Sequence, residues 1–205
     1  GNFKEEPGPW FMHHYVEDLK KFLAEKKIEK AVLCGLSMGG YVALHFAQKY
    51  PAAVQGLILC DTQAAADSNE AKDKRFATLE KIQKDGLEKF AKEFTGNVLS
   101  ESAPQTLRGQ VEAMVLKNKP ASVGMVLGTL ASRKDSTLFL PEIKCPTLVL
   151  VGAEDKVTTP AVNQKMAEAI PDAEFRTIEK AAHLSNLEQP EAFNAHVGEF
   201  LKKNF

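Results

Sequence analysis

A serine, an aspartate and a histidine that could act together in acyl transfer occur along the chain as Ser37, Asp155 and His183. In such a site the histidine takes the serine proton as a general base and later returns it to the leaving group. The aspartate holds the histidine tautomer and stabilises the imidazolium that forms. Each residue follows a predicted strand, and the carboxyl ends of parallel strands meet at one edge of a sheet. The residue types and their order therefore predict a hydrolase with Ser37 as nucleophile.

Ser37 lies in a Gly-x-Ser-x-Gly turn between Gly35 and Gly39. The apolar run 31–34 before the turn predicts a buried parallel strand, and apolar residues at helical spacing follow it. So sharp a turn requires a strained positive φ at Ser37 and close approach of strand and helix at both glycines. The helix N-terminus favours developing negative charge, and we expect the Met38 N–H to be one oxyanion donor. A turn without chemistry is the alternative, which the strand-turn-helix context disfavours.

Two aspartates are candidates for the acid. Asp155 ends a Gly-x-Glu-Asp turn after the apolar run 147–151, and Asp61 stands at the carboxyl end of the run 56–61. Both runs predict buried strands, so both carboxylates are expected at the same edge of the sheet. Asp61 could also be a loop carboxylate that caps or turns the chain.

His183 is the histidine best placed to be the base. It stands in a loop after residues 173–178, a short and less apolar run typical of an edge strand. His45 follows Ser37 on the same predicted helix, roughly 12 Å along its axis, which is too far to reach the serine proton. We therefore expect His45 to be a packing or surface residue.

The chain divides into a core and a helical insertion. Apolar runs typical of buried parallel strands alternate with helical patterns over residues 1–62 and 137–205. Residues 63–136 instead contain four helical patterns in succession and no apolar strand run. We predict an α/β fold in which the first two ranges form a mostly parallel sheet with helices on both faces, and the third forms the insertion.

Composition restricts the partners. The chain has 26 Lys and Arg against 27 Asp and Glu, so no basic field attracts nucleic acid or an anionic membrane. No apolar run approaches the roughly 20 residues that span a bilayer. No metal-ligand cluster or phosphate-loop lysine is present, so we expect no metal and no cofactor. The cysteines Cys34, Cys60 and Cys145 lie in or beside apolar strands, which predicts buried free thiols in a reducing, cytoplasmic compartment.

From residue 12 onward the chain resembles the α/β-hydrolase superfamily, most strongly at residues 35–41, 133–137, 146–160 and 182–193. The Asp-Ser-Thr and His-Leu-Ser-Asn-Leu-Glu-Gln-Pro stretches look like those of small bacterial carboxylesterases related to 3-oxoadipate enol-lactonase. The resemblance implies hydrolysis of a small-molecule ester or lactone, without a cofactor, under a helical cap formed by residues 63–136. In that family the acid more commonly follows a Gly-x-Glu-Asp turn, which favours Asp155 over Asp61.

The chain departs from that family in two places. Ala182 stands where relatives usually have glycine before the histidine. The family also has strands before its first helix and a His-Gly loop that supplies the second oxyanion N–H, and residues 1–11 read as a loop that matches neither. We therefore expect residues 31–34 to be a central strand, with N-terminal strands missing from this chain. A complementary N-terminal segment or a second chain would then lie beside that strand.

A carboxylic ester hydrolase is the leading hypothesis. Lactonases, thioesterases and peroxidases with the same three residues are not separated from it by sequence. Dehalogenases use an aspartate as nucleophile, so Ser37 argues against that branch. The alternative of another class is a non-catalytic or incomplete module that keeps the three residues and lacks the oxyanion His-Gly loop.

Overall fold

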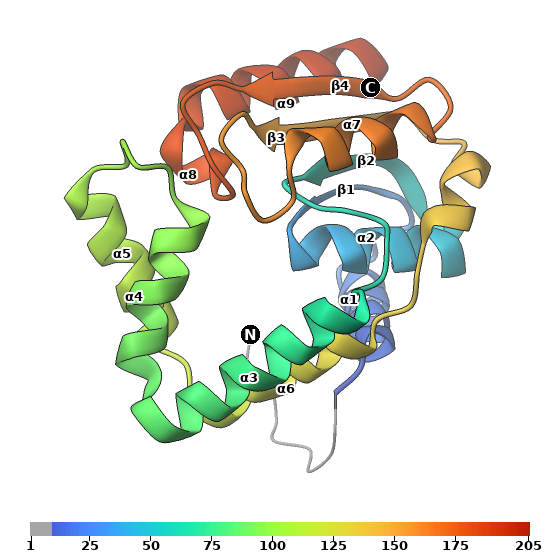
Figure 1. Cartoon of the computed structure of the whole chain (residues 1–205). Coiled ribbons are helices and arrows are strands. Elements are labelled where there is room, and N and C mark those ends of the chain that lie inside the picture. Colours follow the sequence, from blue (N-terminus) through green and yellow to red (C-terminus); the bar gives the residue numbers. More distant parts are fainter. Residues whose placement is uncertain (1–9) are drawn as a thin grey trace.

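Residues 10–205 are described by a computed structural model in which four parallel strands form one sheet (Figure 1). The strands follow one another across the sheet in chain order as β1 Ala31–Leu36, β2 Val54–Cys60, β3 Thr147–Gly152 and β4 Glu174–Ile178. Because each neighbouring pair is parallel, all four carboxyl ends lie at the same edge. The predicted α/β class with a parallel sheet is confirmed.

Strands β2 and β3 are the interior strands, and both are continuous apolar runs because both of their faces are covered. All six residues of β3 are buried, and in β2 only Gln55 is exposed. Strand β4, in which only Ile178 is buried, lies at an edge as predicted. The register pairs Leu36 with Cys60 and Cys60 with Leu150. The turns that follow β1 and β2 therefore begin at one level, and β3 extends two residues beyond it to Gly152.

Strand β1 lies at the other edge and, within residues 10–205, pairs only with β2. In the sheet described β1 is an edge strand, so its expected central position, which depends on further strands beside it, stays a prediction. The further strands expected beside β1 stay a prediction, and the loop expected at 1–11 falls outside the described residues except for Trp10 and Phe11. The expectation of buried thiols holds for Cys60 but is wrong for Cys34, which is exposed, and for Cys145, which is half-buried.

Helices cover both faces of the sheet (Figure 1). Helices α1 Met12–Glu25, α2 Met38–Lys49 and α7 Pro160–Glu168 pack on one face, and α9 Pro190–Asn204 packs on the other. The larger core cluster joins helix residues to one face of the strands, and includes Val16, Leu44, Phe46, Leu57, Leu59, Val149 and Met166. The smaller cluster lies beneath α9 and includes Ile58, Cys60, Leu148, Leu150 and Phe200. Three short helices complete the core, namely η1 Pro51–Ala53, η2 Thr137–Glu142 and α8 Ser185–Glu188.

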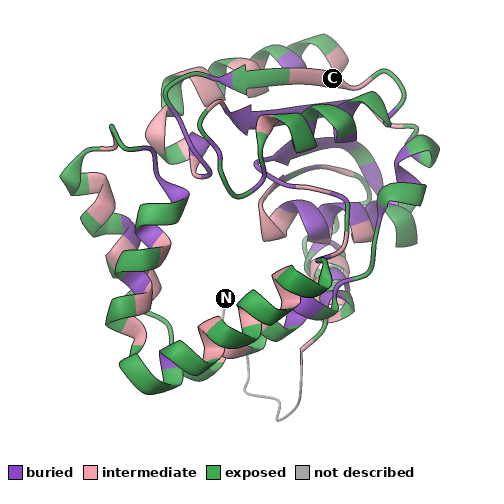
Figure 2. Ribbon diagram, viewed as in Figure 1, coloured by how far each residue is buried: buried purple, intermediate pink, exposed green. Residues whose placement is uncertain are grey.

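The helical insertion (residues 63–136) leaves the core after β2 and returns before β3 as α3 Asn69–Asp85, α4 Leu87–Val98, α5 Gln105–Leu116 and α6 Pro120–Ser132. Helix α3 packs along α6 and α4 along α5, so the insertion forms an arm that extends from the sheet (Figure 1). Its surface is mostly exposed, whereas the sheet is mostly buried (Figure 2). The Ser136 N–H donates to the Ala64 carbonyl at 2.9 Å and joins the two ends of the insertion. None of the helices within residues 10–205 is both long and apolar enough to cross a membrane.

Candidate active site

Ser37 occupies a sharp turn between β1, which ends at Leu36, and α2, which begins at Met38. Its φ of 51° and ψ of −113° lie where residues with a Cβ are rarely found, so the predicted positive φ is confirmed. The Ser37 N–H donates to the Cys60 carbonyl at 2.9 Å, and the Thr62 hydroxyl donates to the Ser37 carbonyl at 2.7 Å. These bonds from the end of β2 hold the strained conformation in place.

Two glycines permit the close approach of this turn to its surroundings. A Cβ on Gly35 would lie 2.3 Å from the Gly39 carbonyl oxygen, and a Cβ on Gly40 would lie 2.5 Å from Thr62 Oγ1. A Cβ on Gly39 would meet nothing within 4 Å, so the expectation that Gly39 must lack a side chain is wrong. The second glycine that close packing requires is Gly40, because it faces the Thr62 side chain.

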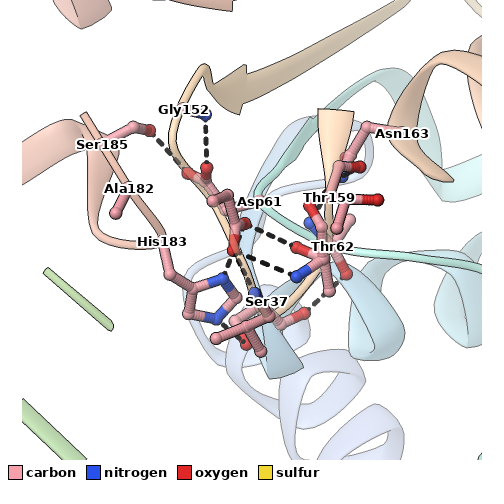
Figure 3. Close-up of polar contacts among 12 residues, drawn as sticks. Ser37, Asp61, Thr62, Gly152, Thr159, Asn163, Ala182, His183 and Ser185 are labelled. Carbon is pink, nitrogen blue, oxygen red and sulfur yellow. Dashed lines mark hydrogen bonds and ion pairs between the residues drawn. The ribbon is translucent and has the colours of Figure 1, made fainter. Parts of the chain in front are cut away.

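The side chains of Ser37 and His183 meet at the carboxyl ends of the strands (Figure 3), and the Asp155 carboxylate contacts the other nitrogen of the His183 ring. His183 Nε2 lies 2.9 Å from Ser37 Oγ, and His183 Nδ1 lies 2.9 Å from Asp155 Oδ2. His183 and Asp155 are 4% and 3% exposed, whereas Ser37 is half-buried. A proton on Nδ1 that is donated to Asp155 leaves Nε2 as the acceptor for the Ser37 proton. The arrangement can therefore perform base-assisted attack by the serine oxygen.

The Asp155 carboxylate is held by more than the histidine. Its Oδ1 accepts the N–H groups of Val157 at 2.7 Å and Thr158 at 3.0 Å, and its Oδ2 accepts the Thr158 hydroxyl at 2.8 Å. Burial by itself would raise the pKa of Asp155, but the hydrogen bonds and charge of His183 and the bonds from Thr158 lower it overall. Asp155 therefore stays ionised and oriented. The hydrogen bonds from Thr158 to Asp155 could not be predicted from the sequence, which shows only that the two residues share a loop.

Asp61 forms its hydrogen bonds with residues other than His183. It follows β2 with a φ of 46°, is fully buried, and accepts the Gly152 N–H at 2.8 Å through Oδ1. Its Oδ2 accepts the Ser185 hydroxyl at 2.5 Å, as Figure 3 shows. Burial raises the pKa of Asp61 to about 7 against the opposing effect of these two hydrogen bonds. Asp61 thus joins the ends of β2 and β3 to the loop that carries His183.

Met38 is the first residue of α2 and directly follows Ser37. Its N–H has no acceptor in the repeating pattern of the helix and adds to the positive end of the helix dipole. That placement fits the oxyanion role expected for it. Within residues 10–205 no group of three or more His, Cys, Asp or Glu side chains is arranged to hold a metal ion.

An ion cluster beside the site is visible only in the structure. The buried Asp67 carboxylate, at the start of the insertion, binds both Arg75 and Arg133. Arg133, at the end of the insertion, also donates to the Ala65 carbonyl at 2.6 Å, and its guanidinium lies 4.2 Å from the centroid of the Tyr41 ring. Tyr41 lies one turn along α2 from Ser37. The cluster therefore fixes the base of the insertion beside the nucleophile helix.

A family model for hydrolases, described as serine aminopeptidase, S33, matches residues 11–190. The chain is 29% identical to 3-oxoadipate enol-lactonase 2 of Acinetobacter baylyi, over 97% of this chain and 73% of that protein. A thermophilic esterase from Thermogutta terrifontis, solved with malate bound, is 38% identical with a TM-score of 0.93, over 99% of this chain and 76% of that chain. The enol-lactonase of Burkholderia xenovorans is 25% identical with a TM-score of 0.89, over 98% and 77% of the two chains.

Proposed function

The chain belongs to this hydrolase family and has the α/β-hydrolase fold, and on that premise we propose that it cleaves a carboxylic ester or lactone through an acyl-enzyme on Ser37. The observation that carries the proposal is the pair of 2.9 Å contacts that connect Ser37 Oγ to His183 and His183 to Asp155. Ester and lactone substrates are supported by the named activities of relatives matched over nearly the whole chain.

The proposed reaction has two halves. In the first, Ser37 Oγ attacks the ester carbonyl while its proton passes to His183 Nε2. The tetrahedral intermediate then collapses, the alkoxide leaves with the proton from His183, and the acyl group stays on Ser37. In the second half, water gives a proton to His183 and attacks the acyl carbonyl. Collapse of this second tetrahedral intermediate breaks the bond to Ser37 Oγ, which takes the proton back from His183 as the carboxylic acid is released. Asp155 stabilises the imidazolium in both halves.

The oxyanion of the intermediate needs donors. We assign one of them to the Met38 N–H at the start of α2. The second donor is proposed to come from a complementary N-terminal segment or a second chain on the free edge of β1, the strand that leads to Ser37. Loss of one such donor costs about 3 kcal/mol in the transition state. Full activity is therefore expected only when that edge is occupied.

A non-catalytic module is the less favoured alternative. Such a module would not need the strained backbone of Ser37, whose φ of 51° costs on the order of 1–3 kcal/mol of stability. Nor would it require a buried histidine held between a serine and an ionised carboxylate. Together these features favour catalysis.

Hydrolysis of p-nitrophenyl esters of increasing acyl length tests the proposal. The native protein is expected to turn over at least one ester, and Ser37→Ala is expected to abolish turnover. Ser132→Ala, which changes an exposed serine at the end of α6, is the matched control and is expected to have no effect. Equal turnover by the native protein and Ser37→Ala would overturn the proposal.

A further inference from the structure

The loop that carries His183 is bound to the helical insertion by hydrogen bonds. The Leu184 N–H donates to the carbonyl of Val98, the last residue of α4, at 3.2 Å. The Ser100 N–H, in the connection between α4 and α5, donates to Glu188 Oε2 at 2.9 Å. Figure 1 shows the end of α4 beside α8. The insertion is thus attached to the core a second time, at a point far from its own two ends.

Glu188 binds on both sides of this junction. While its Oε2 accepts from Ser100, its Oε1 accepts the N–H of Ala182 at 2.8 Å. Ala182 is buried and directly precedes His183. One carboxylate therefore joins the residue before the proposed base to the insertion. Hydrogen bonds to an ionised acceptor are roughly twice as strong as neutral ones, so this bridge is stronger than the backbone contact beside it.

Apolar packing closes the junction against water. Leu184 packs against a cluster formed by Val98, Leu99 and Val111, which are all buried. Ser100, whose N–H meets Glu188, is 4% exposed. A buried N–H that loses its acceptor is destabilising, so the insertion cannot move away from the loop unless Ser100 finds another partner. Separation of α4 from the His183 loop therefore has an energetic cost.

The opposite side of the same loop is bound to the sheet. Ser185, two residues after His183, donates its hydroxyl to Asp61 at the end of β2. The loop is thus held between two carboxylates, with Asp61 on the sheet side and Glu188 on the insertion side. The two attachments have different consequences, because Asp61 contacts no residue of the insertion in the hydrogen bonds described.

We propose that Glu188 is a positioning residue that couples the helical insertion to the imidazole of His183. This proposal rests on the proposed function. It means that the Glu188 carboxylate sets both the orientation of the His183 base and the placement of α4 and α5 beside the site. A substrate that displaces these helices would thereby also reorient the base. In the hydrogen bonds described for residues 10–205, Glu188 accepts from Ala182 and Ser100 and from no reacting atom, so it acts through these two residues.

Glu188→Ala and Glu188→Gln in the native protein test this coupling. Alanine removes both acceptors, whereas glutamine keeps the shape and only one acceptor oxygen. Glu199→Gln on the exposed side of α9 is the matched control. Amide hydrogen exchange, with no activity readout, is expected to accelerate in Glu188→Ala in both segments, residues 98–108 and residues 182–188. Acceleration in only one segment, or in neither, would overturn the coupling.

The base itself provides the second readout. In Glu188→Ala we expect the low-field proton resonance of the His183 Nδ1–H to broaden, and kcat to fall on the order of 10–100-fold with a smaller change in KM. Glu188→Gln is expected to be intermediate, and it serves alone if the alanine variant does not fold. An unchanged resonance and unchanged kcat would contradict the positioning role. If Ser37→Ala still hydrolysed esters, the proposed function would fail, while the exchange and resonance data would still decide this inference.

Discussion

Asp61 Oδ2 lies 2.5 Å from the Ser185 hydroxyl, although the two residues are 124 positions apart in the chain. Asp61 therefore binds the loop that carries His183 through Ser185, whereas Asp155 binds the imidazole of His183 itself. Two carboxylates that sequence alone presents as alternatives therefore have separate partners, and their substitutions are expected to have different effects.

The nucleophile is expected to be the only residue labelled by a fluorophosphonate. The probe should label the native protein and should not label Ser37→Ala, because the Ser37 hydroxyl lies 2.9 Å from His183 Nε2, which can take its proton. Mass spectrometry of the labelled peptide checks this. Cys34→Ser, which removes the nearest exposed thiol in sequence, should leave labelling unchanged. Label that persists in Ser37→Ala would reject the assignment.

Asp155→Asn is expected to lower kcat on the order of 10⁴-fold, because an amide cannot hold the imidazole in the required tautomer. Steady-state hydrolysis of the best p-nitrophenyl ester measures the change. Asp172→Asn, at an exposed residue, is the control and should have full activity. A mild Asp155→Asn together with an inactive Asp61→Asn would identify Asp61 as the acid instead.

Asp61 is expected to make stability fall with rising pH. The unfolded chain releases this proton near pH 4, whereas burial raises the pKa of Asp61 in the folded protein to about 7. Between these values the folded state holds more protons at Asp61, so the contribution of Asp61 to the free energy of unfolding decreases as pH rises, by up to about 4 kcal/mol. Urea unfolding near pH 4 and near pH 7 should show a smaller decrease in Asp61→Asn. The exposed Asp73→Asn should leave the decrease unchanged, and an equal decrease in all three proteins would disprove the prediction.

Arg133→Ala is expected to lower the free energy of unfolding by about 3 kcal/mol, because it leaves part of the buried Asp67 carboxylate unpaired. Arg176→Ala removes an exposed ion pair with Glu174 and should cost at most about 1 kcal/mol. Urea titration of both variants makes the comparison. Equal losses would show that the cluster at the base of the insertion adds no more than a surface pair.

The free edge of β1 is expected to require a partner. Among residues 10–205 no strand pairs with the outer side of β1, an edge of this kind invites association, and Cys34 on β1 is exposed. Residues 1–205 expressed alone should therefore aggregate and turn over esters poorly, and a complementary N-terminal segment should restore both properties. Sedimentation and ester turnover measure the two effects. A stable monomer of residues 1–205 with normal turnover would contradict the proposed second oxyanion donor.

Local sequence pattern predicts much of this fold. Unbroken apolar runs locate β2 and β3, and apolar residues at helical spacing locate the four helices of the insertion. Both are local signals, because a buried strand and a helix with one buried face each impose their own spacing of apolar residues. The strained turn at Ser37 is also predictable, since Gly35 and the order of strand, turn and helix reflect backbone geometry, whereas the requirement at Gly40 in place of Gly39 is not. The position of β1 in the sheet is not predictable in this way, because its own apolar run does not indicate whether it has a neighbouring strand on one side or on both.

The contacts around the site are less predictable. Glu188 looks like a helix-end carboxylate in sequence, and its partner Ser100 lies 88 positions away. The Thr62 side chain leaves no room for a Cβ on Gly40, and Arg133 pairs with the buried Asp67 carboxylate. Neither contact follows from the spacing of apolar residues in the sequence. Such pairings depend on how the insertion folds back onto the core.

The hydrogen bond between Ser136 and Ala64 closes the insertion at its root, so its two ends leave the sheet side by side. A segment joined in this way can be exchanged for one of another length without altering the strand order. Divergence of substrate preference through replacement of α3–α6 is therefore structurally simple. The attachment at Glu188 adds one condition to any such graft, since the new segment must again present an N–H to that carboxylate.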